Sequence, residues 1–284
     1  MNQALKLYKE AVDVLNQDDF ELEADIYRAL GQYYLRDRVY DKALENFIEC
    51  FEISKEHLKQ DPSDMYKLLA DIGNCEFNLE YYKSSIESFK CAEAIYLKNK
   101  EIFSNAQVFP IYKKLGEASA HRKIGQTQEA IKYYEAASDH MADEIVPSER
   151  ASLYSSIASC YMSVSDLDKS VENNLKAIEQ YTNDHSRKSN LETSRCYFYI
   201  GFAKIKVKNN LIQAKYYTSA LDNLDKSIEF RVQGQEPLNT EMGVIYSQKG
   251  LVLLIVKDYL GAIKFYELAL SCFSNSRKKD ILEW

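Results

Sequence analysis

The chain has 284 residues, of which 46% are hydrophobic and 28% charged, and its formal net charge is −7. This acidic balance argues against sequence-independent binding to nucleic acid, which needs a basic face. With nine glycines and four prolines the chain contains few residues that interrupt helices, so we expect an all-α protein without a sheet. No apolar run approaches the roughly eighteen residues of a membrane span.

A pattern of small and aromatic residues returns every forty or so residues. In each copy a Gly or Ala is followed after about twelve residues by Ala or Ser, then by an aromatic residue, then by another small residue. Three copies agree closely: Gly31, Ala43, Phe47, Cys50; Gly73, Ser85, Phe89, Ala92; and Gly250, Ala262, Tyr266, Ala269. Two more begin at Ala118 and Ala158, and a sixth fits in part, with Gly201, Ala214, Thr218 and Leu221. A fixed period of this length predicts a solenoid of helix pairs.

Taken in chain order, the elements form one continuous solenoid over residues 1–284. We expect a half repeat at 2–17, helix pairs at about 24–60, 66–100, 111–145, 151–183, 194–232 and 243–274, and a polar segment at 275–284. Asp61-Pro62 marks one boundary between pairs, with Ser63 or Asp64 as the expected N-cap of the next helix.

These residues resemble the tetratricopeptide repeat, which pairs a helix A with a helix B. The family places a large residue four positions before the Gly of helix A, where this chain has Tyr27, Leu69, Tyr154, Tyr197 and Tyr246. The resemblance implies a right-handed superhelix of about six pairs plus the N-terminal half repeat. Small residues let two helices approach closely, and the aromatic residue fills the space between neighbouring repeats.

Repeats longer than usual, together with Ile72-Gly73-Asn74 in a helix A, resemble three groups within this family. These are the Rap and NprR-type peptide receptors, kinesin light chains and the LGN-type adaptors. The family is defined by packing and not by chemistry, so the resemblance implies a class of function without naming a partner.

In such a superhelix the A helices line the concave groove, and side chains one face away from the packing positions point into it. This selects the candidate residues Arg28, Gln32, Arg36, Lys67, Asp71, Asn74, Asn78, Tyr112, Ser119, Arg122, Arg195 and Tyr199, with Phe198 and Phe202 beside the last two. Amides and guanidinium groups toward one end and aromatic rings toward the other suit an extended or helical peptide.

Asn74 is the strongest single candidate, because its amide can donate to and accept from a peptide backbone at the same time. In peptide-binding members of the resembled family an Asn directly after the small residue of helix A has this role. The basic side chains of Arg28, Arg36, Lys67 and Arg122 suit acidic groups of a partner. The two-carboxylate clamp of chaperone cochaperones is not reproduced.

Catalytic motifs are absent from the sequence. The four histidines lie far apart, the six cysteines share no metal-ligand spacing, and no Gly-rich phosphate loop exists. We therefore expect no enzymatic activity, no cofactor, no metal and a cytoplasmic protein whose cysteines are mostly buried.

The sequence favours a non-catalytic scaffold that binds another protein or a peptide in its groove, with no direct contact to nucleic acid or membrane. Two alternatives stay open. One is a peptide-sensing regulator of the Rap or NprR kind, whose superhelix changes shape on binding a short peptide. The other is a self-assembling subunit, a homo-oligomer that forms through the ends of the solenoid.

Overall fold

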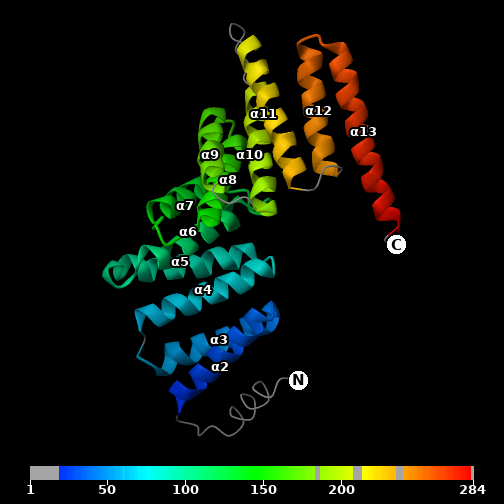
Figure 1. Cartoon of the computed structure of the whole chain (residues 1–284). Coiled ribbons are helices and arrows are strands. Elements are labelled where there is room, and N and C mark those ends of the chain that lie inside the picture. Colours follow the sequence, from blue (N-terminus) through cyan, green and yellow to red (C-terminus); the bar gives the residue numbers. More distant parts are fainter. Residues whose placement is uncertain (1–18, 60, 183–185, 207–212, 235–238, 283–284) are drawn as a thin grey trace. The chain divides into compact units, whose positions relative to one another are not determined.

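The computed structural model describes residues 19–59, 61–182, 186–206, 213–234 and 239–282. Within these ranges the chain is all-α and has twelve α-helices and one 3₁₀ turn (Figure 1). The chain divides into two compact units, Met1–Ala142 and Asp143–Trp284. The predicted half repeat at 2–17 lies outside the described residues.

The first unit contains three helix pairs. Their bounds are α2 Phe20–Arg36 with α3 Tyr40–His57, α4 Pro62–Asn78 with α5 Tyr82–Lys98, and α6 Asn105–Ala120 with α7 Thr127–Asp139; the 3₁₀ turn Lys100–Ile102 precedes α6. The two helices of each pair pack against one another. Each B helix also contacts the A helix of the next pair in the same unit. This is the sequential packing that the repeat predicts.

The second unit contains three further pairs. They are α8 Pro147–Ser163 with α9 Leu167–Tyr181, α10 Arg187–Lys206 with α11 Gln213–Gln233, and α12 Thr240–Ile255 with α13 Tyr259–Leu282. The segment that follows residue 274 continues α13 as far as Leu282, so the polar residues there extend a helix B and do not begin a new helix.

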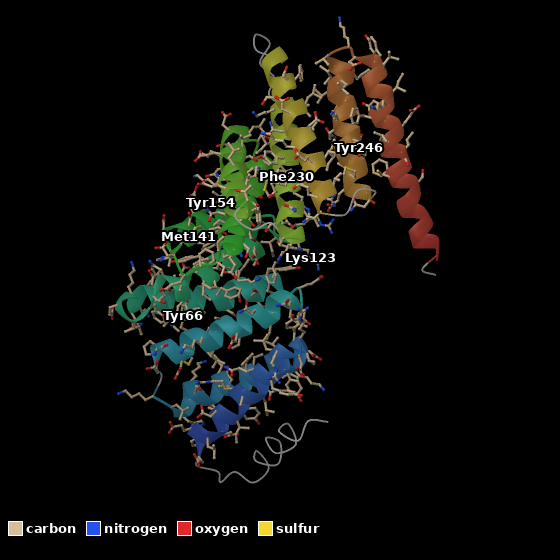
Figure 2. The ribbon with its side chains drawn as sticks, in the orientation of Figure 1. Tyr66, Lys123, Met141, Tyr154, Phe230 and Tyr246 are labelled. Carbon is tan, nitrogen blue, oxygen red and sulfur yellow. The ribbon has the colours of Figure 1, made fainter. Side chains whose placement is uncertain are left out.

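The glycine of helix A lies directly against the aromatic ring of helix B, as the spacing predicts. A Cβ added to Gly31 would lie 2.6 Å from the Phe47 ring, and one added to Gly73 would lie 2.9 Å from the Phe89 ring. We call this glycine the anchor of its pair. The large residue four positions earlier packs against the core, as Tyr154 and Tyr246 do in the second unit (Figure 2).

In the third pair the anchor is Gly116 and not Ala118. A Cβ at Gly116 would lie 2.5 Å from the Tyr134 ring. Residues 121–126 connect α6 to α7, whereas only 37–39 connect α2 to α3. The sequence prediction assumed the shorter connection between the two helices. It therefore placed the anchor at Ala118, two residues after its actual position. With Gly116 as anchor, Tyr112 becomes the large residue four positions before it.

The partially matching copy also packs through other residues than its sequence suggested. Gly201 of α10 faces the Leu224 side chain and the backbone of Ala220, and not Thr218 or Leu221. Leu224 and Ala220 are both fully buried. The connection between these helices includes residues 207–212, and the side chain of Ala214 also lies outside the described residues.

Helix A ends in the same turn in four pairs. The second residue beyond the helix has a φ of 60° to 67° in every case: Arg38, Glu80, Ser165 and Lys257. The next amide donates to a carbonyl five residues earlier, as Val39 does to Tyr34 at 2.9 Å. This Schellman arrangement satisfies helix-end carbonyls and turns the chain into helix B.

Proline and aspartate together start α4. Pro62 is its first residue, and the Asp61 carboxylate accepts hydrogen bonds from the amides of Ser63 and Asp64 at 2.8 and 3.2 Å. The N-cap is therefore Asp61 and not Ser63 or Asp64. Proline at the first helical position lacks the N–H that would need a partner, so the cap falls immediately before it.

Candidate functional site

Four positions of α4 lie away from the packing surface, and the positions at the same spacing in the other A helices define the same row. They stand six and two residues before the anchor, and one and five residues after it, and we call them the helix-A row. In α4 the row consists of Lys67, Asp71, Asn74 and Asn78. Lys67 and Asn78 are exposed, while Asp71 and Asn74 are half-buried. All four were predicted from the sequence, and the structure places them along one helix.

The carboxamide of Asn74 has no hydrogen-bond partner within the part of the chain that the structure describes. The Asn78 amide, by contrast, donates to the Asn74 backbone carbonyl at 2.7 Å. On α2, Gln32 and Arg36 are exposed, and the Arg36 guanidinium lies 5.4 Å above the Tyr33 ring. The first unit therefore presents amide and guanidinium groups on two neighbouring A helices.

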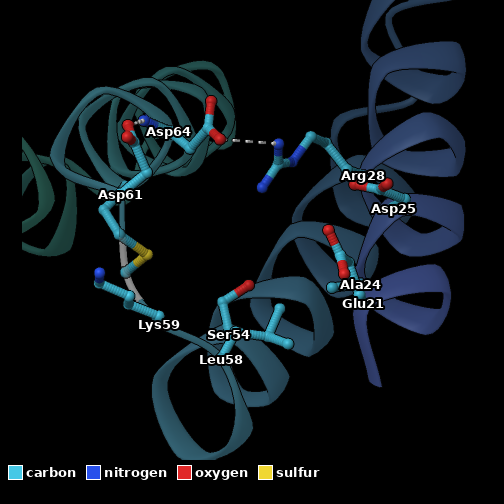
Figure 3. Close-up of a pocket in the computed structure, with 10 residues that line it drawn as sticks. Glu21, Ala24, Asp25, Arg28, Ser54, Leu58, Lys59, Asp61 and Asp64 are labelled. Carbon is cyan, nitrogen blue, oxygen red and sulfur yellow. Dashed lines mark hydrogen bonds and ion pairs between the residues drawn. The ribbon is translucent and has the colours of Figure 1, made fainter. Parts of the chain in front are cut away.

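Arg28 of α2 reaches toward α4 across a cavity of about 240 Å³ (Figure 3). Its Nη1 lies 3.9 Å from Asp64 Oδ2, and its Nε is buried without a hydrogen-bond partner among the described residues. Burial raises the pKa of Asp71 to about 6, and the charge of Arg28 offsets part of that rise. Arg28 thus lies among acidic groups but forms no short hydrogen bond with any of them.

Tyr112, Ser119 and Arg122 do not form part of an open row, in contrast to the prediction. Tyr112 is 7% exposed and Ser119 is fully buried. Arg122 is exposed but lies in the turn after α6 and not on the helix. The positions of Tyr112 and Ser119 follow from the anchor being Gly116, because the two-residue shift moved the predicted row onto the packing face. Arg122 is not a row position, and it lies beyond the end of α6 at Ala120.

Counted from Gly116, the row of α6 contains Lys114 and Glu117. Lys114 Nζ lies 2.7 Å from Glu117 Oε2 and 4.5 Å from the centre of the Phe77 ring. The sequence analysis did not select these two residues. The glycine itself was the available signal, since Gly116 precedes an aromatic residue in the next helix just as Gly31 and Gly73 do.

In the second unit a cavity of about 170 Å³ lies between α10 and α12. The predicted residues Arg195 and Tyr199 line it, together with Phe198, Ser194, Arg231, Glu241, Val244 and Ile245. Tyr199 and Val244 are 45% and 39% exposed. Apolar walls with a few charged groups are typical of a pocket that receives a side chain.

One carboxylate holds the charged groups of this cavity together. Arg195 donates to Glu192 at 2.6 Å and to Glu241 at 2.8 Å. The buried Arg231 pairs with the other oxygen of Glu241. Burial alone would raise the pKa of Glu241, but the hydrogen bond from Arg195 and the charge of Arg231 lower it below its usual value. The carboxylate is therefore ionised at neutral pH.

Each unit has an ion pair of this kind between two successive A helices. Asp64 and Glu241 each stand nine residues before an anchor glycine, and each pairs with an arginine of the preceding helix A, Arg28 or Arg195. Sequence reasoning missed Glu241, Arg231 and Val244. The acidic residue at a fixed distance from the glycine was a detectable signal, but the arginine that meets it is specified only by packing.

The helix-A row of α12 differs in chemistry from that of α4. Its residues are Val244, Gln248, Leu251 and Ile255, at the positions that Lys67, Asp71, Asn74 and Asn78 occupy in α4. Val244, Leu251 and Ile255 are 39%, 37% and 42% exposed. The same face of helix A is thus polar in α4 and apolar in α12.

Neither a membrane segment nor a metal cluster is found in the described ranges. None of the helices there is long and apolar enough to cross a membrane. No group of three or more His, Cys, Asp or Glu side chains in these ranges has the arrangement of a metal site. Five of the six cysteines are buried and Cys91 is exposed; burial raises the pKa of Cys160 and Cys196 to about 11.

The comparisons with known proteins agree with the helix-pair fold. Residues 24–64 and 111–139 match the tetratricopeptide repeat family. The TPR repeat-containing protein MJ1428 of Methanocaldococcus jannaschii is 24% identical over an alignment of 280 residues, and the alignment covers 89% of this chain and 46% of that protein. The chain thus spans about half the length of that relative.

Two solved structures have a similar fold. One is a signal-transduction ATPase with a tetratricopeptide repeat sensor, PH0952 of Pyrococcus horikoshii, with a TM-score of 0.71, 17% identity and coverage of 99% of this chain and 40% of that one. The other is the apo form of RapI, with a TM-score of 0.64, 16% identity and coverage of 89% and 66%. The likeness is one of fold alone. With its sequential helix pairs, anchor glycines and two matching segments, the chain contains tetratricopeptide repeats and folds as a TPR-like solenoid.

Proposed function

We propose that this protein is a non-catalytic scaffold that binds a peptide or a helix of another protein along its helix-A rows. The observation that carries the proposal is the exposed apolar row of α12 beside the cavity between α10 and α12. Exposed apolar side chains next to a hollow with a few fixed polar groups are the usual features of a peptide-binding face.

The polar row of the first unit supports the same function. Asn74 offers an amide without a bonding partner in the described part of the chain, and Gln32 and Arg36 of α2 offer an exposed amide and an exposed guanidinium. Groups of this kind bond the backbone and acidic side chains of a peptide. Burial raises the pKa of the half-buried Asp71 to about 6, so its charge at neutral pH is unfavourable for folding, as charged groups at functional sites often are.

The test is affinity capture of partners from the source cell, followed by mass spectrometry. The intact chain is compared with a polar-row variant, Asn74→Ala with Arg36→Ala, and an apolar-row variant, Tyr199→Ala with Leu251→Ser. We expect at least one partner to be captured by the intact chain and lost from one of the row variants. The segment of that partner that binds is then measured by calorimetry.

The matched control is Glu45→Ala with Glu52→Ala, since both glutamates are exposed on α3, a helix B, away from the rows. All variants must retain the helicity of the intact chain by circular dichroism. Partners that remain bound to both row variants, or that are lost equally from the control, would show that the rows are not the binding surface.

The sensor alternative makes a further prediction for the same complex. A regulator of the Rap kind binds a short peptide and changes shape, whereas an adaptor keeps its shape and binds a longer segment. Small-angle X-ray scattering with and without the bound segment distinguishes them. A lower radius of gyration with a short peptide favours the sensor, and an unchanged one favours the adaptor.

A further inference from the structure

The cavity between α2, α3 and α4 exists because two small residues stand where the next helix pair has aromatic rings. Counted from the anchor glycines, Ala24 and Ser54 of the first pair correspond to Tyr66 and Tyr96 of the second. The two tyrosines are 4% and 9% exposed, and the Tyr66 hydroxyl donates to the Gln107 carbonyl at the start of the following helix A. Their rings therefore fill the space that stays open in the first pair as a cavity of about 240 Å³. Folded proteins contain few voids larger than a water molecule, so a cavity of this size is a candidate binding site.

The floor of the cavity carries a hydroxyl that lacks a partner. Ser54 is 5% exposed, and its Oγ forms no hydrogen bond of ordinary geometry with any described residue. Figure 3 shows this oxygen directed into the cavity. It lies beside the thiol of Cys50, which is only a weak hydrogen-bonding group. A hydroxyl buried in this way is unfavourable unless something bonds it, so the Ser54 oxygen is a bonding position for a ligand.

The rim of the cavity is acidic. Glu21 and Asp25 of α2 and Asp64 of α4 are exposed and line the cavity (Figure 3). The complete charged lining consists of four carboxylates and two basic side chains: Glu21, Asp25, Asp61, Asp64, Arg28 and Lys59. The cavity therefore has an excess of negative charge.

The groups that would suit an anion are already matched within the protein. The amides at the start of α4 are bonded, because the Asp61 carboxylate accepts hydrogen bonds from those of Ser63 and Asp64. The Arg28 guanidinium interacts with Asp64 at 3.9 Å and with the charge of Asp71. An anion in the cavity would also be repelled by the carboxylates of the rim. The lining therefore favours a cation.

Two carboxylates of the rim remain for that cation. Glu21 and Asp25 line the cavity and form no ion pair with any described residue. Ala24 and Met65, which are 1% and 7% exposed, add apolar walls. A positively charged head on an aliphatic stem matches this combination, as basic side chains lay their methylene groups along apolar surface.

We propose that this cavity binds the guanidinium or ammonium head of a basic organic group. The head donates to the Ser54 oxygen and to the carboxylates of Glu21 and Asp25, and the stem lies against Ala24 and Met65. The group belongs either to an arginine or lysine side chain of a bound peptide or to a free amine. Of these residues Asp25 alone has a row position, so the site goes beyond the surface proposed above and does not depend on it.

The experiment is a titration of the isotope-labelled full chain with Nα-acetyl-arginine amide, followed by NMR. Its citrulline analogue has the same shape without the charge and is the matched control ligand. We expect the arginine probe to bind with a dissociation constant of about 1 mM and to shift amides of α2, the end of α3 and the start of α4. The citrulline probe should shift none of them. Equal binding of the two probes would overturn the proposal.

Two variants test the bonding groups. Ser54→Ala should raise the dissociation constant about tenfold, and it should not lower the melting temperature, because the lost hydroxyl has no partner in the protein. Glu21→Gln with Asp25→Asn should raise the dissociation constant by a similar factor. Glu45→Gln with Glu52→Gln makes the same change of charge on exposed positions of α3 outside the cavity and should have no effect. An unchanged affinity in both cavity variants would contradict the assignment.

Arg28→Gln gives an effect of the opposite sign. Removing the positive charge inside the cavity should lower the dissociation constant of the arginine probe about threefold. If this variant retains its helicity and loses the probe, Arg28 itself holds the ligand and the cavity is not a cation site.

The two sources of the cation are distinguished by comparing spermidine with a short alanine peptide that carries one central arginine. Tighter binding of the peptide than of the arginine probe identifies a side chain of a peptide, and tighter binding of spermidine identifies a free amine. The polar-row variant, Asn74→Ala with Arg36→Ala, should bind the arginine probe as the unchanged chain does. Failure of partner capture on the rows and failure of this titration are therefore separate results.

Discussion

Asp71 carries a charge in a place that disfavours it. Burial raises the pKa of this carboxyl from 3.8 to about 6 despite the opposing charge of Arg28. Between these two pH values the folded protein binds more protons than the unfolded chain, so the free energy of unfolding falls as the pH rises from about 4 to about 6. Above that range the loss is complete, and at neutral pH it amounts to at most about 3 kcal/mol.

Replacing Asp71 by Asn removes this cost, because the amide keeps the shape without the charge. We expect Asp71→Asn to stabilise the protein at pH 7.5 by about 1–2 kcal/mol, with the gain shrinking toward pH 4. Urea denaturation followed by circular dichroism at both pH values measures the difference. A variant that is less stable than the unchanged chain at pH 7.5 would show that the attraction of Arg28 outweighs burial.

At the scale of single elements, the turn from helix A to helix B repeats with little variation. Ser165, the second residue after α8, has a φ of 64°, and the next amide, that of Asp166, donates to the Tyr161 carbonyl at 2.9 Å. A left-handed conformation costs a residue with a side chain roughly 1 kcal/mol or more, and it costs glycine almost nothing.

Ser165→Gly should therefore stabilise the protein by about 0.5 kcal/mol, since the relief of strain exceeds the added entropy of the unfolded chain. Ser165→Val should destabilise it by about 1–2 kcal/mol, because a β-branched side chain fits this conformation least well. Thermal unfolding of the two variants measures both effects. Equal melting temperatures for the Gly and Val variants would contradict the role of the left-handed turn.

The anchor glycine of a helix pair was predictable where helix A and helix B are joined by a connection of the usual length. Gly31, Gly73 and Gly250 lie against Phe47, Phe89 and Tyr266 as the spacing predicts. The prediction was wrong for the third pair, because the longer connection from α6 to α7 moved the anchor to Gly116. The repeat pattern predicts which types of residue pack together, but it does not predict the length of the connection between the two helices.

The candidate site was predictable only in part for a related reason. The rows of α2 and α4 follow from the anchor, and so do Arg195 and Tyr199. The ion pair from Arg195 to Glu241 joins side chains 46 residues apart in sequence and depends on how α10 packs against α12. No local pattern specifies such a contact, so it emerges only from the packed structure.

At the scale of the whole molecule, the chain consists of two units with their own buried clusters. One cluster in the first unit contains Phe47, Leu68 and Cys75, and one in the second contains Leu224, Met242 and Val252. In repeat proteins stability is close to a sum of local terms and neighbouring contacts. A local defect should therefore open the helices near it before it affects distant ones.

Gly116→Ala in the first unit and Gly250→Ala in the second test whether a defect stays local. The added Cβ would lie 2.5 Å from Tyr134 in the first variant and 3.1 Å from Tyr266 in the second. Overpacking costs about 1–3 kcal/mol and the higher helix propensity of alanine offsets about 1 kcal/mol, so the first variant should be the less stable.

Hydrogen exchange followed by mass spectrometry locates the effect. We expect Gly116→Ala to speed exchange in α6 and α7 while the amides of α12 and α13 keep their protection, and Gly250→Ala to do the reverse. Exchange that accelerates equally in both units for either variant would mean that they open together. In that event a partner bound to the row of one unit would also stabilise the other, whereas independent opening confines the gain in protection to the unit that the partner contacts.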